Sequence, residues 1–129
     1  MKEPRWLATL MIRAIHAGQV REHGGTLGLR DEALLESALA RPRHRYGYDE
    51  GVDLIGLAAA YGFGLARDHP FIDGNDRVAF QAMYVFLGLN GYRIDAEEAA
   101  VVRLMLAVAA GEISEPELDA WLRRHTVER

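Results

Sequence analysis

The sequence predicts an all-α fold in one domain. Apolar residues recur at three- and four-residue intervals along most of the chain, and short segments rich in Gly, Pro, Asp and Asn separate these helical stripes. No segment shows a convincing apolar–polar alternation of the kind that a half-buried strand requires. A chain of 129 residues without repeats or linkers is large enough to bury one core. We therefore expect about six helices in a single domain over residues 1–129.

The composition excludes several classes of protein. The chain has no cysteine, so disulfides and thiolate metal sites are not possible, and its net charge of −4 argues against direct nucleic-acid binding. No run of about 18 uncharged apolar residues predicts a membrane span. The first residues lack the basic-then-apolar layout of a signal peptide. We expect a cytoplasmic protein that does not bind a membrane.

The first helices are predicted over Trp6–Arg21 and from Asp31 onward. A stripe of apolar residues supports the first helix, and the pair Gly24-Gly25 ends it. Asp31 is a suitable N-cap for a short second helix, which we expect to close at Pro42.

Two polar features lie outside the predicted loops. His16 sits on or beside the first apolar stripe, where a half-buried or surface histidine is a simpler explanation than a ligand. A basic cluster follows the second helix, and it is explained either as a solvated helix end or as a charged rim for a target or nucleotide. The cluster consists of Arg41, Arg43, His44 and Arg45.

Two strongly apolar segments, Val52–Arg67 and Asn75–Leu89, form the predicted central pair of helices. The first is apolar on nearly all sides, which is typical of a helix that its neighbours bury. It contains Gly56, Gly62 and Gly64, each of which costs up to about 1 kcal/mol in a helix interior. Close packing of another helix explains them, although an end near Gly62 is the alternative.

Two further helices complete the fold. Asp95 and Glu98 form a variant capping box before an apolar stripe that ends at Gly111. Ser114 and Glu117 form a clearer capping box, and the helix that follows is expected to fray after Leu122.

The loop between the two central helices carries the candidate chemistry. Its sequence is His69-Pro70-Phe71-Ile72-Asp73-Gly74-Asn75-Asp76-Arg77. Pro70 disfavours helix at the residue before it, so the first central helix should end near Asp68. Gly74 and Asn75 suit the start of the next helix, whose free N–H groups and positive dipole end attract phosphate.

Three side chains complete a phosphoryl- or nucleotidyl-transfer site. Arg77 can add a forked cationic contact to a bound phosphate. Asp73 can hold a divalent cation on the phosphates, and His69 can take a proton from an attacking hydroxyl. Because Phe71 is apolar among polar neighbours, we expect it to pack inward and support the loop.

This loop resembles the signature of the Fic/Doc family, and the chain from about Ile12 to Arg124 resembles the death-on-curing (Doc) toxin branch. The resemblance implies the all-α Fic fold. It implies that His69 is the catalytic base, that Asp73 positions Mg²⁺ and that Arg77 contacts phosphate. Gly74, Asn75 and the neighbouring Asp76 then form the nucleotide-binding turn.

The resemblance also implies a function. Doc toxins are thought to transfer the γ-phosphoryl group of ATP, or another nucleoside triphosphate, to elongation factor Tu, whereas most Fic enzymes transfer AMP. Their target is held by a flap before the central helix, which we expect at Tyr46–Asp49. An inhibitory Ser/Thr-x-x-x-Glu-Gly/Asn pattern is absent from this chain, so the inhibitor is expected to be a separate antitoxin that binds an apolar groove.

Two departures from the family pattern concern the second helix of the pair. Adenylylating Fic proteins usually have Gly where this chain has Asp76 and a second Arg where it has Phe80, which disfavours AMP transfer. Doc toxins usually have Lys at the position of Asp76. Replacing an opposite charge by a like charge about 4 Å from a phosphate oxygen weakens the free energy of phosphate binding by several kcal/mol, even at an effective dielectric near 20. The alternatives to a Doc-like kinase are therefore a nucleotidyl transferase and a catalytically impaired binding protein.

Overall fold

The computed structural model describes all residues from Met1 to Arg129. It contains six helices and two short strands, which confirms the predicted all-α class. In chain order these are α1 (Thr9–His23), α2 (Glu32–Tyr48), α3 (Leu54–Asp68), α4 (Asn75–Leu89), β1 (Tyr92–Ile94), α5 (Glu98–Ala109), α6 (Glu115–His125) and β2 (Thr126–Glu128).

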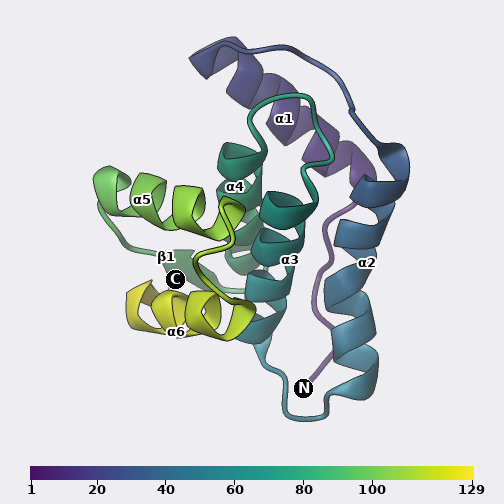
Figure 1. The fold of residues 1–129 in the computed structure, drawn as a ribbon. Helices are drawn as coiled ribbons and strands as arrows, with labels where there is room; N and C mark the ends of the chain where they lie inside the picture. The colour runs from purple at the N-terminus through teal and green to yellow at the C-terminus, as the bar shows by residue number, and fades with distance from the viewer.

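Helices α3 and α4 form the centre of the molecule. Figure 1 shows α2 beside α3, α1 across the end where α3 and α4 are joined, and α5 and α6 on the opposite side. Most of α3 is buried, as its apolar sequence predicts. A Cβ added at Gly62 would overlap the Met83 side chain of α4, so close helix packing explains that glycine. The alternative end near Gly62 is wrong, because α3 continues to Asp68.

The second helix is longer than predicted. We expected it to close at Pro42, but α2 continues through that proline to Tyr48. Pro42 is buried with Leu35 and Ala38 on the face of α2 that packs against α3. Burial of this face outweighs the local cost of a proline inside a helix, which is about 3 kcal/mol.

The C-terminal part contains the strands that the sequence did not reveal. β1 and β2 pair in antiparallel register with Arg93 opposite Val127, and three-residue strands are too short to show an alternating pattern. Helix α6 begins with the predicted Ser114–Glu117 capping box. It does not fray after Leu122 but runs to His125. The N-cap of α5 is Glu97 and not the predicted Asp95, because residues 93–95 extend along β2.

No helix combines the length and the apolar composition needed to cross a membrane.

Candidate active site

Helix α3 ends at the predicted position, and His69 is its C-cap. This residue has left-handed backbone angles (φ 48°, ψ 57°) and is the one non-glycine residue with a positive φ. The Arg30 guanidinium donates from Nε to the His69 carbonyl at 2.7 Å and from Nη2 to the Asp68 carbonyl at 2.8 Å. Arg30 therefore satisfies the last carbonyls of α3 and holds the backbone of His69, whose side chain stays exposed.

The α3–α4 loop (residues 69–74) lies along the segment that joins α1 to α2. The Arg30 N–H donates to the Pro70 carbonyl at 2.8 Å, and the Ile72 N–H donates to the Gly28 carbonyl at 3.1 Å. Leu29 and Phe71 form an isolated antiparallel bridge between these contacts. Figure 1 shows the two segments together at the top of the molecule.

The strand-like partner of the loop is therefore residues 24–30 and not Tyr46–Asp49. The expected flap position was wrong, because Tyr46–Asp49 is the end of α2 and the turn before α3. That turn and His69 are separated by the whole of α3, a 15-residue helix about 22 Å long. The resemblance did not reveal that the segment after α1 pairs with the loop.

The interior of the loop is closed by Phe71 and Asn75. Phe71 is buried at 2% exposure, as predicted. The Asn75 amide accepts from the Phe71 N–H and donates to the Phe71 carbonyl, both at 2.9 Å. The side chain of Asn75 thus supports the loop, and only its backbone N–H is available to a ligand.

Asp73 is held at both its side chain and its backbone. Its Oδ2 accepts from the Thr26 N–H at 2.8 Å, and its side chain lies 3.3 Å from the position of a Cβ at Gly25, whose φ of +110° also favours glycine. The Asp73 carbonyl is 2.9 Å from Nε2 of His16. The other carboxylate oxygen has no protein partner.

The start of α4 offers free hydrogen-bond donors. Gly74 adopts left-handed angles (φ 76°), and the N–H groups of Asn75, Asp76 and Arg77 have no protein acceptor. The side chains of Asp76 and Arg77 form no ion pair. An anion at this helix start meets open N–H groups, the positive end of the dipole and an unpaired guanidinium.

These groups surround one polar pocket of about 350 Å³. Its lining brings together predicted and unpredicted residues: His23, Gly24, Gly25, Asp73, Gly74, Asp76 and Arg77. His69 does not line this pocket and lies at the opposite end of the loop. Asp76 faces the site, so its negative charge is part of the environment that a phosphate meets.

The residues at this pocket fit a magnesium ion that arrives with a nucleotide. No group of three His, Asp or Glu side chains in the molecule could hold a metal by itself. Mg²⁺ in nucleotide sites is usually bound by one or two carboxylates together with phosphate oxygens and water. Asp73, with one free carboxylate oxygen beside the open N–H groups of the α4 start, would supply that kind of ligand.

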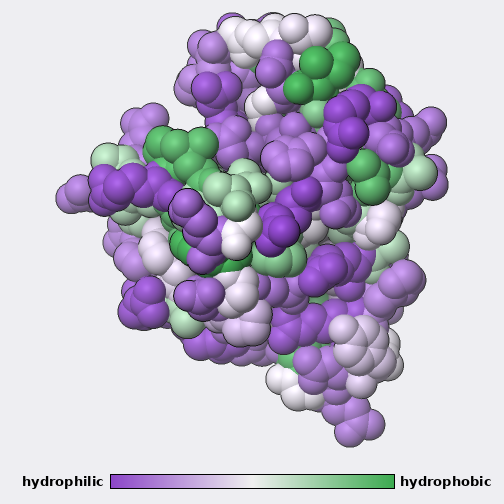
Figure 2. All heavy atoms as spheres, viewed as in Figure 1, coloured by the Kyte–Doolittle hydropathy of each residue, from purple (hydrophilic) through white to green (hydrophobic).

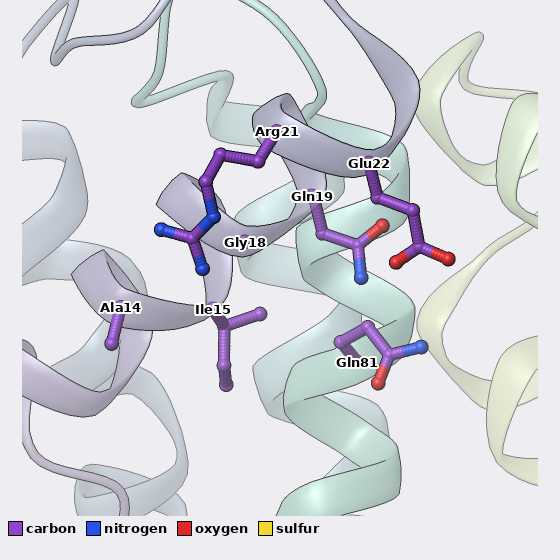
Figure 3. A pocket seen from close by; sticks show the side chains of 7 residues that line it. All are labelled: Ala14, Ile15, Gly18, Gln19, Arg21, Glu22 and Gln81. Carbon is purple, nitrogen blue, oxygen red and sulfur yellow. The ribbon is translucent and has the colours of Figure 1, made fainter.

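A groove of about 370 Å³ continues from the pocket between α4 and α5. Asp76, Arg77 and His23 line both. Half of the groove's lining residues are hydrophobic, among them Phe80, Tyr84, Val101, Val102 and Met105, and Gln19, Glu22, Gln81 and Glu98 are polar. A shallower hollow of about 480 Å³ lies on α1, where Figure 3 shows Gln19 and Glu22 near Gln81 of α4. That hollow contains none of the predicted site residues.

Sequence reasoning missed the residues that hold the loop from outside it. His16, Thr26 and Arg30 all contact residues 68–73. The one available signal was His16 on an apolar stripe, and we favoured a half-buried or surface position for it. It is 2% exposed, with its ring stacked on Phe71 at a centroid distance of 4.0 Å.

Comparison with known proteins identifies the family of this chain. The model of the Fic/DOC family matches residues 6–87, which include both the loop and the segment that pairs with it. The protein kinase Doc of Escherichia phage P1 is 35% identical over 112 residues, covering 86% of this chain and 87% of the phage protein. The toxin Doc of Mycolicibacterium smegmatis is 44% identical over 75 residues, covering 57% of this chain and 58% of that toxin. The chain therefore belongs to the Fic/DOC family, and within it resembles the Doc toxins.

Proposed function

We propose that this protein is the toxin of a toxin–antitoxin system and that it transfers the γ-phosphoryl group of ATP to a hydroxyl of a translation protein of the elongation factor Tu class. The observation that carries the proposal is the pocket at the start of α4, where open N–H groups, Arg77 and the Asp73 carboxylate surround one volume. The similarity to a protein named as a kinase favours phosphoryl transfer over other uses of such a pocket.

The reaction needs a base and an anion site on opposite sides of the transferred group. His69 accepts the proton of the target hydroxyl as the hydroxyl oxygen attacks the γ-phosphorus. A bond forms between that oxygen and phosphorus, the bond from phosphorus to the β–γ bridging oxygen breaks, and ADP leaves. Because the His69 side chain is exposed, a hydroxyl on another protein can reach it.

The charge of the nucleotide is held by this chain's own groups. Arg77 and the N–H groups of residues 75–77 bind phosphate oxygens, while Asp73 holds Mg²⁺ against them. The magnesium ion, when bound, neutralises charge that develops on the phosphates. The hydrogen bond from the Thr26 N–H to Asp73 Oδ2 fixes the orientation of the carboxylate and therefore of its free oxygen.

A protein target is favoured by the exposed surface of the two paired segments. Leu27 and Ile72 are 61% and 49% exposed, and both belong to the two paired segments. Figure 2 shows a hydrophobic patch at the top of the molecule, where these segments lie. An exposed apolar patch on the paired segments, one of which begins at His69, suits contact with a protein more than with a small polar substrate.

Asp76 is the observation that favours a second candidate, a Fic-fold protein with impaired catalysis that binds without turnover. It lines the phosphate pocket and has no cation partner, so it opposes a bound anion. Transfer of AMP instead of phosphate is the other alternative. Phe80 has no positive charge for a second phosphate contact, which disfavours AMP transfer.

The partner that restrains the toxin is proposed to be a separate antitoxin. The groove between α4 and α5 is open at the surface, half of its lining residues are hydrophobic, and Arg77 and Asp76 also line it. An amphipathic segment with its apolar face in this groove would cover the approach to the phosphate pocket.

The test uses purified protein, Mg²⁺, elongation factor Tu and ATP labelled separately at the α- and γ-phosphates. We expect label on the target from the γ-phosphate only, and none with His69→Ala. His44→Ala is the matched control, because His44 is an exposed histidine on α2.

Other results would redirect the assignment. Label from the α-phosphate would make the protein a nucleotidyl transferase. No label from either position, with transfer restored by Asp76→Lys, would identify the chain as a catalytically impaired binding protein. No label from either form of the protein would contradict the proposed target or nucleotide.

A further inference from the structure

The molecule buries very few polar side chains, and two of them hydrogen-bond to the α3–α4 loop. Apart from Tyr61, the buried side chains with polar groups are His16 at 2% exposure and Asn75 at 9%. A polar group is costly to bury unless it is hydrogen-bonded, so its partner shows what the burial achieves. Asn75 hydrogen-bonds to Phe71 and His16 hydrogen-bonds to Asp73.

The hydrogen bond between His16 and the Asp73 carbonyl has only one possible donor. The Asp73 carbonyl can only accept, so Nε2 of His16 carries the proton and donates across 2.9 Å. The ring is stacked on Phe71 with an interplanar angle of 12°, and this contact fixes the plane in which the N–H points. Helix α1 thus reaches, from 57 residues away in sequence, the one residue of the loop that we propose binds magnesium.

The contact also affects the donors at the start of α4. In a helix continued backward by one turn, the Asp73 carbonyl would accept the N–H of Arg77. It faces His16 instead, and the Arg77 N–H has no protein acceptor. The same hydrogen bond therefore holds Asp73 in place and directs its carbonyl to His16. The Arg77 N–H is left free to bind an anion.

We propose that His16 is a positioning residue, whose Nε2–H holds the Asp73 carbonyl. In this position the Asp73 carboxylate and the open N–H groups of α4 can contact the same magnesium-bound polyphosphate. The inference rests on the proposed function for the identity of that ligand. The positioning itself is a property of this chain and can be measured without a nucleotide.

Three substitutions separate the donor from the packing. His16→Gln places an amide donor at about the reach of Nε2, His16→Phe keeps an aromatic ring on Phe71 without a donor, and His16→Leu serves if the Phe variant does not fold. His125 is the matched control, because it also stacks on an aromatic ring, that of Trp121 at 4.0 Å, and bonds a carbonyl from Nδ1 at 2.8 Å. His125 lies on α6, far along the chain from the loop.

The first readout is the amide proton resonance of Thr26, which a hydrogen bond to the Asp73 carboxylate shifts downfield. Asp73→Asn defines the resonance without that carboxylate. We expect His16→Phe to move the Thr26 resonance toward the Asp73→Asn position, while His16→Gln and His125→Phe leave it in place. A Thr26 resonance that stays at the wild-type position in both His16→Phe and His16→Leu would overturn the proposal.

The second readout is calorimetric binding of magnesium tripolyphosphate. Loss of one hydrogen bond predicts weaker binding by between about two- and thirteenfold in His16→Phe, with recovery in His16→Gln. If the wild-type protein does not bind this ligand, the proposed function fails, and the Thr26 resonance still decides whether His16 positions Asp73. Equal affinity in wild type and His16→Phe would overturn the proposed role toward the ligand.

Discussion

Two charged regions of this molecule differ in whether their charged side chains form ion pairs. Around α2 and α6, arginines are matched with carboxylates: Glu115 accepts from Arg41 at 2.6 Å and from Arg45 at 3.1 Å. Arg123 similarly bridges Asp53 at 2.6 Å and Asp119 at 2.9 Å. In the loop and the first turn of α4, Asp76 and Arg77 have no ionic partner.

The contrast distinguishes charges that hold the fold from charges that are available to a ligand. Two arginines of the basic cluster, Arg41 and Arg45, are ion-paired on α2, and Arg43 lies over the Trp6 ring at 5.1 Å. These contacts favour the structural interpretation of that cluster over a charged rim for a target. At the start of α4 the unpaired donors can be satisfied by an incoming anion. Substitutions in the two regions should therefore separate activity from stability.

The largest effect is expected from His69→Ala. Loss of a general base typically lowers a rate by about 10² to 10⁴-fold, and an exposed side chain contributes little to folding. We expect phosphoryl transfer to fall by at least about 100-fold with an unchanged melting temperature. Steady-state transfer rates and thermal melts of His69→Ala and His44→Ala check this, and equal losses in the two variants would exclude His69 as the base.

Asp76→Lys should raise the affinity for the nucleotide. It replaces a carboxylate in the phosphate pocket by a cation, and at a partly exposed site the gain is about ten- to a hundredfold in affinity for Mg·ATP. Asp76→Asn, which only removes the charge, should give a smaller gain. Both gains should shrink at high salt because exposed charges are screened. Titration calorimetry at low and high ionic strength measures this, and a weaker-binding Lys variant would contradict the assigned phosphate position.

Glu115→Gln should affect stability and leave transfer unchanged. The Glu115 side chain is 15% exposed and neutralises two arginines, so removal of its charge leaves Arg41 without an ionic partner and Arg45 with Asp49 alone. We expect a loss of about 1 to 3 kcal/mol in the free energy of unfolding. Urea unfolding and transfer assays below the midpoint check this prediction. Loss of transfer in the folded variant would show that the two regions are coupled.

The sequence revealed the parts of the site that are contiguous and hid the parts that are distant. Asp73, Gly74, Asp76 and Arg77 share a pocket because one loop and one helix turn carry them, and local backbone rules place such residues. His16 and Arg30 reach the loop from α1 and from the segment after it, which no local rule predicts.

The same limit applies to the fold. Caps and apolar stripes located α3, α4 and the start of α6, because those signals act within one or two turns. They failed at Pro42, where tertiary burial overrides a local penalty, and at β1 and β2, whose pairing joins residues more than 30 positions apart.

The smallest effect is expected from Asp53→Asn, and it depends on pH. A hydrogen bond from Arg123 lowers the pKa of Asp53 below its ordinary value of 3.8. Asn keeps the N-cap contact to the Gly56 N–H, so the substitution removes mainly the ion pair. Because both partners are about half exposed, the pair contributes only about 0.5 to 1 kcal/mol.

The sign of the pH dependence follows from the direction of that shift. A carboxylate with a lowered pKa in the folded state stabilises the fold fully above its unfolded pKa of about 3.9, and this contribution is lost as the pH falls through the folded pKa. We therefore expect Asp53→Asn to lower the melting temperature by about 2 to 4 °C at pH 7 and to match the wild type well below pH 4. Asp95→Asn, at an exposed carboxylate without an ion pair, is the control and should show no such convergence. A difference between Asp53→Asn and wild type that persists in acid would mean that the ion pair with Arg123 is not what Asp53 contributes.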